Sequence, residues 1–456
     1  MSLLATAWRL AACAAAPTLP AYLRHRAGRG KEVPERVAER YGQGAARPEG
    51  PLAWLHAASV GEMLSLLPLV EALGSAAPGL RFLMTTGTRT SAELLERRLP
   101  PALAPRVMHR FVPLDVPRWV ARFLDGWRPD AAVFAESELW PNLIAATAAR
   151  GIPLALVNAR MSDRSLRWWR RAPGLAREVL APFALVLAQT EADAARFRAL
   201  GAPAHCLGNL KYAAPPLPAD AAELARLRGV FGARPAWVAA STHPGEEAVV
   251  LRAHRRLAAA HPGLLTVIVP RHPERGPAVA ALAEGLSVAR RAAGEDPGPG
   301  TAVLVADTLG ELGLFYRLAA CAFVGGSLVE HGGQNPLEPA RLRCPVLLGP
   351  HVWNFAEIVE RMAAAGGLTR IAAGTDLAAA LAEAVSAVLS NPDRGRAQAE
   401  AAAGVAAEEA GLPGRIAAAL LPLVPLRGAT ARPGGRNLAG TALAGPPATR
   451  IVDEGN

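Results

Sequence analysis

Cysteine is scarce in this chain, and no two of its four cysteines stand close enough in sequence to form a CxxC pair. Neither a disulfide framework nor a zinc knuckle is therefore expected, and a reducing compartment is favoured. The ten histidines also lack HxH and HxxxH spacings, so we predict no protein-bound metal. The four cysteines are Cys13, Cys206, Cys321 and Cys344.

Aromatic residues make up only 5% of the chain, and no paired zinc ligands or aromatic RNA-binding signature occur. Nucleic acid is therefore not an expected partner. The net charge of +10 then suits an anionic membrane or a phosphorylated substrate.

Two nucleotide-binding signatures are also missing. No GxGxxG follows a first strand, and no GxxxxGK[ST] loop occurs in the chain. These absences exclude dehydrogenases of the dinucleotide-binding type and P-loop ATPases, and we expect no cofactor.

The first 24 residues are expected to form a membrane anchor. Residues 2–23 are almost wholly apolar, with Arg9 as the only full charge, and a basic cluster follows. The length approaches the roughly 20 residues that cross a bilayer, whereas Arg9, Pro17 and Pro20 favour a position in the interface, so both remain open. We expect this segment to lie outside both protein cores, and residues 426–456, which lack an apolar period, to form a disordered tail.

What the chain does have is two series of short apolar runs that alternate with amphipathic stretches, the pattern of βα units with a parallel sheet. The segment AAPPLPAD separates them, and its prolines favour an interdomain connection. We therefore predict α/β lobes over 51–212 and 235–425, with ligands at the carboxyl ends of the strands. The expected strands are 52–56, 80–85, 131–136, 154–158 and 185–189 in the first lobe, and 236–241, 264–270, 302–306, 322–325 and 345–348 in the second.

The first lobe offers carboxylates at two predicted strand ends. In WLHAASVGE, Glu62 starts a helix after the first strand, where it is either a general base or an acid that interacts with the helix dipole. In FAESELWPN, Glu136 lies nearer the strand end than Glu138 and could stabilise positive charge at an anomeric carbon, or could simply precede a helix beside a buried Trp140. Lys211, just before the linker, could neutralise a phosphate or a carboxylate.

The second lobe offers groups for binding a nucleotide. Arg271 follows a strand in VPRHPER and can bind one phosphate through two bonds, while the backbone of Leu309, Gly310 and Glu311 could contact a base edge. The stretch GGSLVEHGGQNPLEPA combines four glycines with a helix start. There, Asn335 is expected as the N-cap, Pro336 as the first residue and Glu338 as a capping-box acid. The segment is also similar to nucleotide-sugar transferases, in which a carboxylate at this location commonly accepts both ribose hydroxyls, and this similarity implies the same role for Glu338.

Together, these segments resemble the 3-deoxy-D-manno-octulosonic acid (Kdo) transferases of lipopolysaccharide synthesis, and the N-terminal segment is also typical of that family. The resemblance implies a GT-B type fold of two Rossmann-like lobes facing a cleft, with an N-terminal membrane anchor. It also implies transfer of Kdo from CMP-Kdo to the phosphorylated lipid A precursor (lipid IVA) at the cytoplasmic face of the inner membrane. Eight motifs, in order from Pro51 to Phe355, carry it: HAASVGE, ESELWPNLI, NARMSDRS, GNLKY, STHPGEE, PRHPER, GGSLVEHGGQNPLEPA and GPHVWNF.

The resemblance also assigns roles. It makes Glu62 the proton acceptor and Glu136 and Lys211 the transition-state stabilisers of an inverting displacement, with Glu138 as the less favoured alternative to Glu136. Three other functions compete with Kdo transfer: those of a UDP-sugar transferase, a sugar-nucleotide epimerase and an inactive nucleotide-binding protein. The CMP contacts that it implies are Pro270, Arg271, Leu309, Gly310, Glu311, Asn335, Pro336, Leu337 and Glu338.

Overall fold

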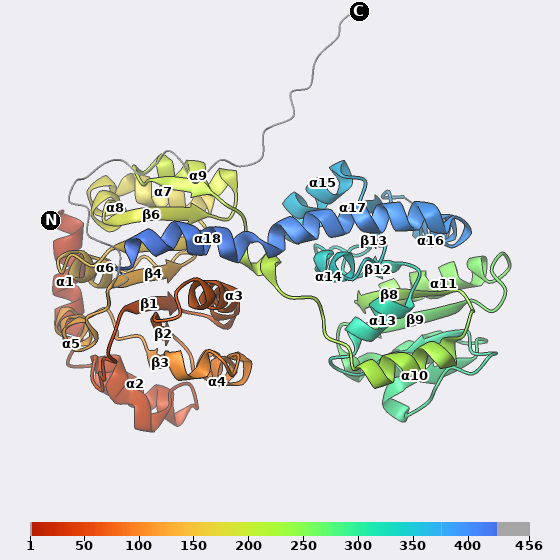
Figure 1. The fold of residues 1–456 in the computed structure, drawn as a ribbon, viewed down its shortest axis with the longest axis horizontal. Coiled ribbons are helices and arrows are strands. Elements are labelled where there is room, and N and C mark those ends of the chain that lie inside the picture. Colours follow the sequence, from red (N-terminus) through yellow and green to blue (C-terminus); the bar gives the residue numbers. More distant parts are fainter. Residues whose placement is uncertain (1, 375, 426–456) are drawn as a thin grey trace, which may run out of the picture. The chain divides into compact units, whose positions relative to one another are not determined.

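The computed structural model describes residues 2–374 and 376–425 and divides the chain into two compact units (Figure 1). Unit 1 contains the described residues of Met1–Ala213 and Gly411–Asn456, and unit 2 is Ala214–Ala410. The first division falls inside the proline-rich segment. The tail expected at 426–456 lies outside the described residues.

Unit 1 is built on a parallel seven-stranded sheet in the order β3-β2-β1-β4-β5-β6-β7. Its central strands are buried along their whole length because helices cover both faces of the sheet, which is why they are continuous apolar runs. The strands are β1 (Leu52–Ala57), β2 (Arg81–Thr86), β3 (Val107–Phe111), β4 (Ala131–Ala135), β5 (Leu154–Ala159), β6 (Phe183–Ala188) and β7 (Ala204–Cys206).

Two hydrophobic clusters, one centred on Trp54 and Phe134 and the other on Leu55 and Leu66, pack against this sheet. The helices of unit 1 are α1 (Leu3–Ala15), α2 (Leu19–Gly28), α3 (Val60–Ala76), α4 (Arg89–Arg98), α5 (Pro117–Trp127), α6 (Pro141–Ala148), α7 (Asp163–Arg171), α8 (Pro173–Leu180), α9 (Glu191–Arg198) and α18 (Leu412–Leu420), with short 3₁₀ helices η1 (Pro34–Tyr41), η2 (Ala104–Arg106), η3 (Leu210–Ala213) and η7 (Leu421–Leu423).

Unit 2 repeats the plan with the parallel order β10-β11-β9-β8-β12-β13-β14. Its strands are β8 (Ala236–Thr242), β9 (Leu265–Pro270), β10 (Val288–Arg290), β11 (Val303–Val305), β12 (Ala322–Val324), β13 (Val346–Leu348) and β14 (Leu368–Arg370). The helices are α10 (Ala221–Phe231), α11 (Glu246–Leu257), α12 (Gly276–Leu282), α13 (Leu312–Leu318), α14 (Leu337–Arg341), α15 (Ala356–Ala364), α16 (Leu377–Ser390) and α17 (Pro392–Ala410), with 3₁₀ helices η4 (Pro273–Arg275), η5 (Arg291–Ala293) and η6 (Trp353–Phe355).

In both sheets the strand order reverses beside the first strand of the unit. β1 lies between β2 and β4, and β8 lies between β9 and β12. The chain therefore first adds strands on one side of the first strand and later adds strands on its other side. The carboxyl ends of the strands at this reversal form the crevice where doubly wound sheets bind ligands.

The second lobe ends earlier than the expected residue 425. After α17 the chain returns to unit 1, and α18 packs against α3 (Figure 1). Leu412, Ile416 and Leu420 are almost fully buried in the same cluster as Leu66. The apolar stripe of α18 thus completes the core of the first unit.

The N-terminal segment differs from its expected place outside both cores. Ala5 of α1 belongs to the core cluster of Trp54, and Leu23 of α2 is 1% exposed. The indole N–H of Trp8 donates to Asp115 at 2.8 Å, which joins α1 to the loop before α5. Within the described residues, no helix combines the length and apolar character needed to span a bilayer.

Candidate active site

Glu62 lies in the first turn of α3, directly after β1. Ser59 is the N-cap, and its hydroxyl oxygen accepts from the Glu62 amide at 3.3 Å. In return, the Glu62 carboxylate accepts from the Ala58 amide and from the Ser59 hydroxyl, both at 2.8 Å. These reciprocal bonds resemble a capping box and fix the carboxylate at the carboxyl edge of the sheet.

The surroundings of Glu62 favour its protonated form. Burial raises the pKa of this carboxyl, the negative charges of Glu138 and Glu136 raise it further, and the bonds from Ser59 and Ala58 oppose the change. A carboxylate whose pKa is moved toward neutral pH is a stronger base, as catalysis of proton transfer requires. Helix capping and proton transfer are thus compatible roles for one residue.

Glu136 and Lys211 come together although they lie far apart in the sequence. Lys211 Nζ lies 2.6 Å from Glu136 Oε1, and the glutamate side chain is 12% exposed. Glu136 has a left-handed φ of 53°, a costly conformation for a residue with a side chain, as β4 gives way to the next loop. The ammonium group of Lys211 therefore balances the negative charge of Glu136. The strained backbone of Glu136 holds that carboxylate at the edge of the sheet.

Asn158, at the end of β5, positions the segment that carries Lys211. Its side-chain oxygen accepts from the main-chain amide of Leu210 at 2.9 Å, and its main-chain carbonyl accepts from the side-chain amide of Gln189 at 3.0 Å. Asn158 is fully buried with a left-handed φ of 52°. In the sequence Asn158 is only the last residue of the expected strand 154–158, and its role as a support for η3 becomes visible with the fold.

Glu138 has different partners from Glu136. His56 Nε2, from buried β1, lies 3.4 Å from Glu138 Oε2, and Trp140 donates to the same oxygen at 2.6 Å. Burial would raise the pKa of Glu138, but the hydrogen bond and charge of His56, with the Trp140 bond, lower it below its usual value. Trp140 is 42% exposed, so the expectation of a buried tryptophan was wrong.

His56 is itself held by a chain of polar groups. Its Nδ1 lies 3.0 Å from the hydroxyl of Thr85, and that hydroxyl accepts from the indole of Trp54 at 2.8 Å. Nδ1 also lies 3.2 Å from the main-chain carbonyl oxygen of Thr85, so Thr85 contacts this ring nitrogen through both its hydroxyl and its main chain. This series of polar contacts could not be predicted from the sequence pattern, because its members lie inside two apolar strands.

In unit 2 a buried carboxylate shapes the glycine-rich segment. Glu246, at the start of α11, is fully buried, and its oxygens accept from the amides of His243, Gly326, Ser327 and Leu328 at 2.7–3.0 Å. Burial raises the pKa of Glu246, and these four bonds oppose the change. The STHPGEE motif therefore contains a structural anchor that the sequence did not single out.

The predicted phosphate ligand Arg271 directly follows β9, whose last residue, Pro270, is buried. The Arg271 amide donates to the Thr242 carbonyl at 3.0 Å, whereas its guanidinium is exposed. Its charge opposes the rise that burial causes in the pKa of Glu338, so the two predicted CMP ligands lie near each other at the carboxyl edge.

The start of α14 differs from the predicted cap. Pro336 is the N-cap and has no capping side chain, while Asn335 accepts from the Leu337 amide at 3.1 Å. The expected capping box is therefore absent from this helix. Burial raises the pKa of Glu338, and Arg341, Asn335 and Arg271 oppose the change.

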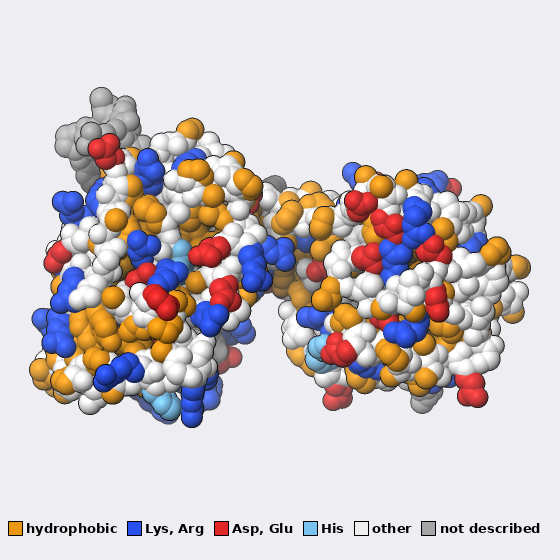
Figure 2. Space-filling view, turned by 90° about the horizontal axis from the view of Figure 1, so that it is seen from below, with side chains coloured by type: hydrophobic (Ala, Val, Ile, Leu, Met, Phe, Trp, Pro, Cys, Tyr) orange, Lys and Arg blue, Asp and Glu red, His pale blue; other side chains and the backbone are white. Residues whose placement is uncertain are grey.

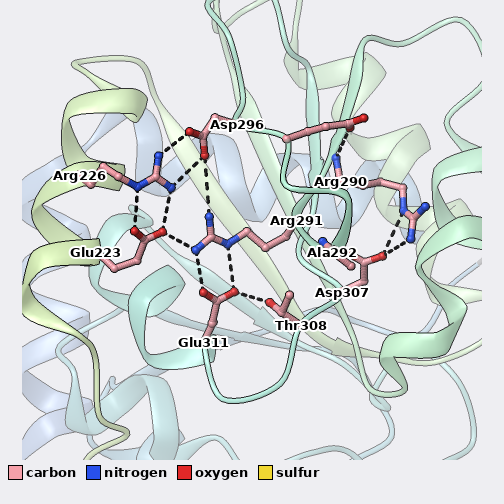
Figure 3. A network of polar contacts seen from close by, with 10 residues as sticks. Glu223, Arg226, Arg290, Arg291, Ala292, Asp296, Asp307, Thr308 and Glu311 are labelled. Carbon is pink, nitrogen blue, oxygen red and sulfur yellow. Dashed lines mark hydrogen bonds and ion pairs between the residues drawn. The ribbon is translucent and has the colours of Figure 1, made fainter.

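At the Leu309–Gly310–Glu311 turn, main-chain groups are open to a ligand, whereas the Glu311 carboxylate already has partners. Leu309 is 83% exposed and Gly310 has a φ of 86°, whereas the Glu311 carboxylate pairs with Arg291 at 2.7 Å and bonds Thr308. Arg291 also pairs with Glu223, so that the turn is joined to α10 (Figure 3). On the face seen in Figure 2, acidic and basic side chains of unit 2 are likewise interleaved.

The chain is similar in sequence to proteins of a known family. A family model described as 3-Deoxy-D-manno-octulosonic-acid transferase (kdotransferase) matches residues 35–214. The 3-deoxy-D-manno-octulosonic acid transferase of Haemophilus influenzae is 38% identical over 367 residues, which cover 79% of this chain and 84% of that protein. The transferase of the same name from Bordetella pertussis is 39% identical, over 84% of this chain and 90% of the relative. The chain belongs to the Kdo transferase family.

This Kdo transferase also shares its fold with solved structures of low sequence identity. The UDP-GlcNAc 2-epimerase of Neisseria meningitidis matches 81% of this chain and 100% of its own length, with a TM-score of 0.54 at 13% identity. The likeness concerns the fold of two parallel-sheet α/β lobes. The family membership, by contrast, makes the protein a glycosyltransferase of lipopolysaccharide core synthesis.

Proposed function

We propose that this Kdo transferase takes Kdo from CMP-Kdo and transfers it to lipid IVA, the phosphorylated lipid A precursor, with inversion at the anomeric carbon. The observation that carries the proposal is the gathering of Glu62, Glu136 and Lys211, from separate elements, at the carboxyl edge of the first sheet. These residues combine a carboxylate of raised pKa, that of Glu62, with the ion pair between Glu136 and Lys211.

In this mechanism the acceptor hydroxyl attacks the anomeric carbon of Kdo while the bond from that carbon to the phosphate oxygen of CMP breaks. Glu62 takes the hydroxyl proton, and CMP leaves with the bonding electron pair. The negative charge of Glu136 stabilises the oxocarbenium character of the sugar, and the ion pair with Lys211 holds that carboxylate in place.

The nucleotide is assigned to unit 2. Arg271 binds the phosphate, Glu338 accepts the ribose hydroxyls, and the main chain of Leu309–Glu311 contacts the base. Pro270, Asn335, Pro336 and Leu337 complete the surface around CMP.

We further propose that the enzyme acts at the cytoplasmic face of the inner membrane and that α1 attaches it there. Leu3, Leu4 and Leu10 are 90%, 51% and 65% exposed, so that a helix packed on unit 1 presents leucines outward. An area of apolar side chains bordered by Lys and Arg also lies on the face of unit 1 seen in Figure 2. Such surfaces suit the interface of an anionic bilayer.

Mass spectrometry tests the reaction directly. Purified protein incubated with lipid IVA and CMP-Kdo should yield lipid IVA that is heavier by one or more Kdo residues, and omission of CMP-Kdo should abolish the product. A protein that makes no product, and whose melting temperature rises with UDP but not with CMP, would instead use a UDP-sugar.

A further inference from the structure

Two imidazoles meet at the point in unit 2 where the strand order reverses. His243 follows β8, and His331 lies in the glycine-rich loop that follows the neighbouring strand β12. Their ring centroids are 3.9 Å apart at an interplanar angle of 34°. Ligands of doubly wound sheets bind at this reversal, yet no role has so far been assigned to either ring.

His243 is the fixed member of the pair. It is 8% exposed, and its Nε2 lies 2.9 Å from the side-chain nitrogen of Gln334. Because an amide nitrogen donates, Nε2 accepts and the ring is neutral with its proton on Nδ1. Burial lowers the pKa of His243, and the neighbouring His331, His272 and Arg271 add to that effect, which agrees with a neutral ring.

His331 is the exposed member of the pair. Its main chain is held on both sides, since its amide donates to the Val329 carbonyl at 2.7 Å and its carbonyl accepts from the Asn354 side chain at 3.0 Å. The stack on His243 holds the ring. Among the described residues, neither ring nitrogen of His331 has a hydrogen-bond partner, so a positioned N–H is available to a ligand.

The loop is built around the two rings. Gly326 has a φ of 68°, and a Cβ there would lie 3.4 Å from a carbon of each imidazole. The two carboxylates that follow His243 in the sequence already have partners: Glu246 accepts four amides, and Glu247 pairs with Arg275 at 2.5 Å. With Arg271 exposed close to His243, the local charge favours an anion.

We propose that His331 binds an oxyanion of the sugar donor through a ring N–H and that His243 and Gln334 hold the ring in place. The anion is either the phosphate of CMP or the carboxylate of the Kdo sugar, since both present the same acceptor chemistry. This inference rests on the proposed function and adds a donor-binding residue to those already named.

The test replaces His331 with Phe, which keeps an aromatic ring on His243 but removes the N–H, and with Ala. Titration of CMP and the KM for CMP-Kdo are measured for each variant, with melting temperature as a check of folding. If the phosphate is bound, CMP affinity falls about tenfold or more in both variants. If the sugar carboxylate is bound, the KM for CMP-Kdo rises by that factor while CMP affinity is unchanged.

His25→Ala, at an exposed histidine of α2 in unit 1, is the matched control and should change neither quantity. Wild-type-like CMP affinity and KM in a folded His331→Phe variant would overturn the proposal, because stacking alone would then explain the ring. Failure of the wild-type protein to transfer Kdo would refute the proposed function instead, and titrations of CMP and of intact CMP-Kdo into the variants would still report on His331.

Discussion

Three glutamates lie close together at the carboxyl edge of unit 1, and each has its own partner. Glu62 accepts from its own helix start, Glu136 pairs with Lys211, and Glu138 faces His56. Like charges this close would normally all resist ionisation, but two of the three are compensated by a cation or a hydrogen-bond donor. The raised pKa of Glu62 and the lowered pKa of Glu138 set the proposed base apart from this neighbour.

Replacing Glu62 with Gln tests the base directly. The amide keeps the side-chain length but cannot accept a proton, so turnover should fall at least about 10²-fold, while CMP affinity and melting temperature stay near those of the wild type. Steady-state kinetics with CMP-Kdo and lipid IVA measure the change. Near-normal turnover would leave Glu62 with the capping role alone.

Replacing Glu138 with Gln tests how its charge acts on Glu62. The charge of Glu138 contributes to the raised pKa of Glu62, so its removal lowers that pKa. A general base works when deprotonated, and the acid limb of the kcat/KM profile should therefore move to lower pH. Glu93→Gln, at a residue of α4 whose side chain is 45% exposed, removes the same charge elsewhere and should leave the profile in place. An unmoved acid limb in Glu138→Gln would contradict the coupling.

Glu338→Gln should lower CMP affinity at least about tenfold. A carboxylate bound to ribose hydroxyls loses charge-assisted hydrogen bonds worth about 1.5–3 kcal/mol each. Because α14 has no capping box, the substitution removes no helix cap, and the melting temperature should change little. Calorimetric titration of CMP measures the affinity. Wild-type affinity in a folded variant would move the ribose contact to another residue.

Some site residues were visible in the sequence and others were not, for a physical reason. Glu62 and Lys211 stand out because charged residues at strand or helix boundaries break an apolar pattern. Asn158, His56 and Glu246 are buried and act on other residues through contacts distant in sequence. A one-dimensional pattern carries no record of such contacts.

At the scale of elements, the sequence located the central strands and missed the edges of both sheets. Each of the ten expected strands overlaps one in the structure, while β3, β7, β10 and β14 were not foreseen. All four are edge strands, and none is buried along its whole length. Strands with one neighbour need no continuous apolar run, so the pattern that reveals a central strand is weak there.

The C-terminal helix was assigned to the wrong lobe for a related reason. An apolar stripe shows that α18 is buried, but the stripe does not show which core it joins. Contact with α3 decides that question. The chain therefore connects the two units twice, near residue 213 and again at Gly411.

This placement predicts the effect of Ile416→Ala. Ile416 is fully buried against unit 1, so its truncation should lower the free energy of unfolding of that unit by about 2–5 kcal/mol. Ala418→Ser, on the exposed side of α18, should cost less than about 0.5 kcal/mol. Chemical denaturation monitored by tryptophan fluorescence measures both, and CMP binding by unit 2 should persist. An equally small effect of the two substitutions would contradict the packing of α18.

For the whole molecule, the proposed membrane attachment has to be tested without damage to the helix α1, which is packed on unit 1. Deletion of residues 1–23 would remove Ala5 and Leu23 from the protein interior, so a loss of membrane binding could not be separated from damage to unit 1. Substitutions confined to the exposed leucines of α1 avoid this problem, because these side chains make little contact with the rest of the unit.

The triple variant Leu3→Ser, Leu4→Ser, Leu10→Ser should therefore move the protein from the membrane pellet to the supernatant with its melting temperature nearly unchanged. Each leucine inserted into the interface contributes up to about 1.5–3 kcal/mol of apolar burial, and three together outweigh a weak electrostatic attraction to anionic lipid. Leu282→Ser, at a 47% exposed leucine of unit 2, is the control and should leave the distribution as it is. If the triple variant stays in the pellet at low and high salt, a surface other than α1 holds the enzyme at the membrane. If it is released only at high salt, the basic surface of the protein is the main attachment and the leucines are secondary.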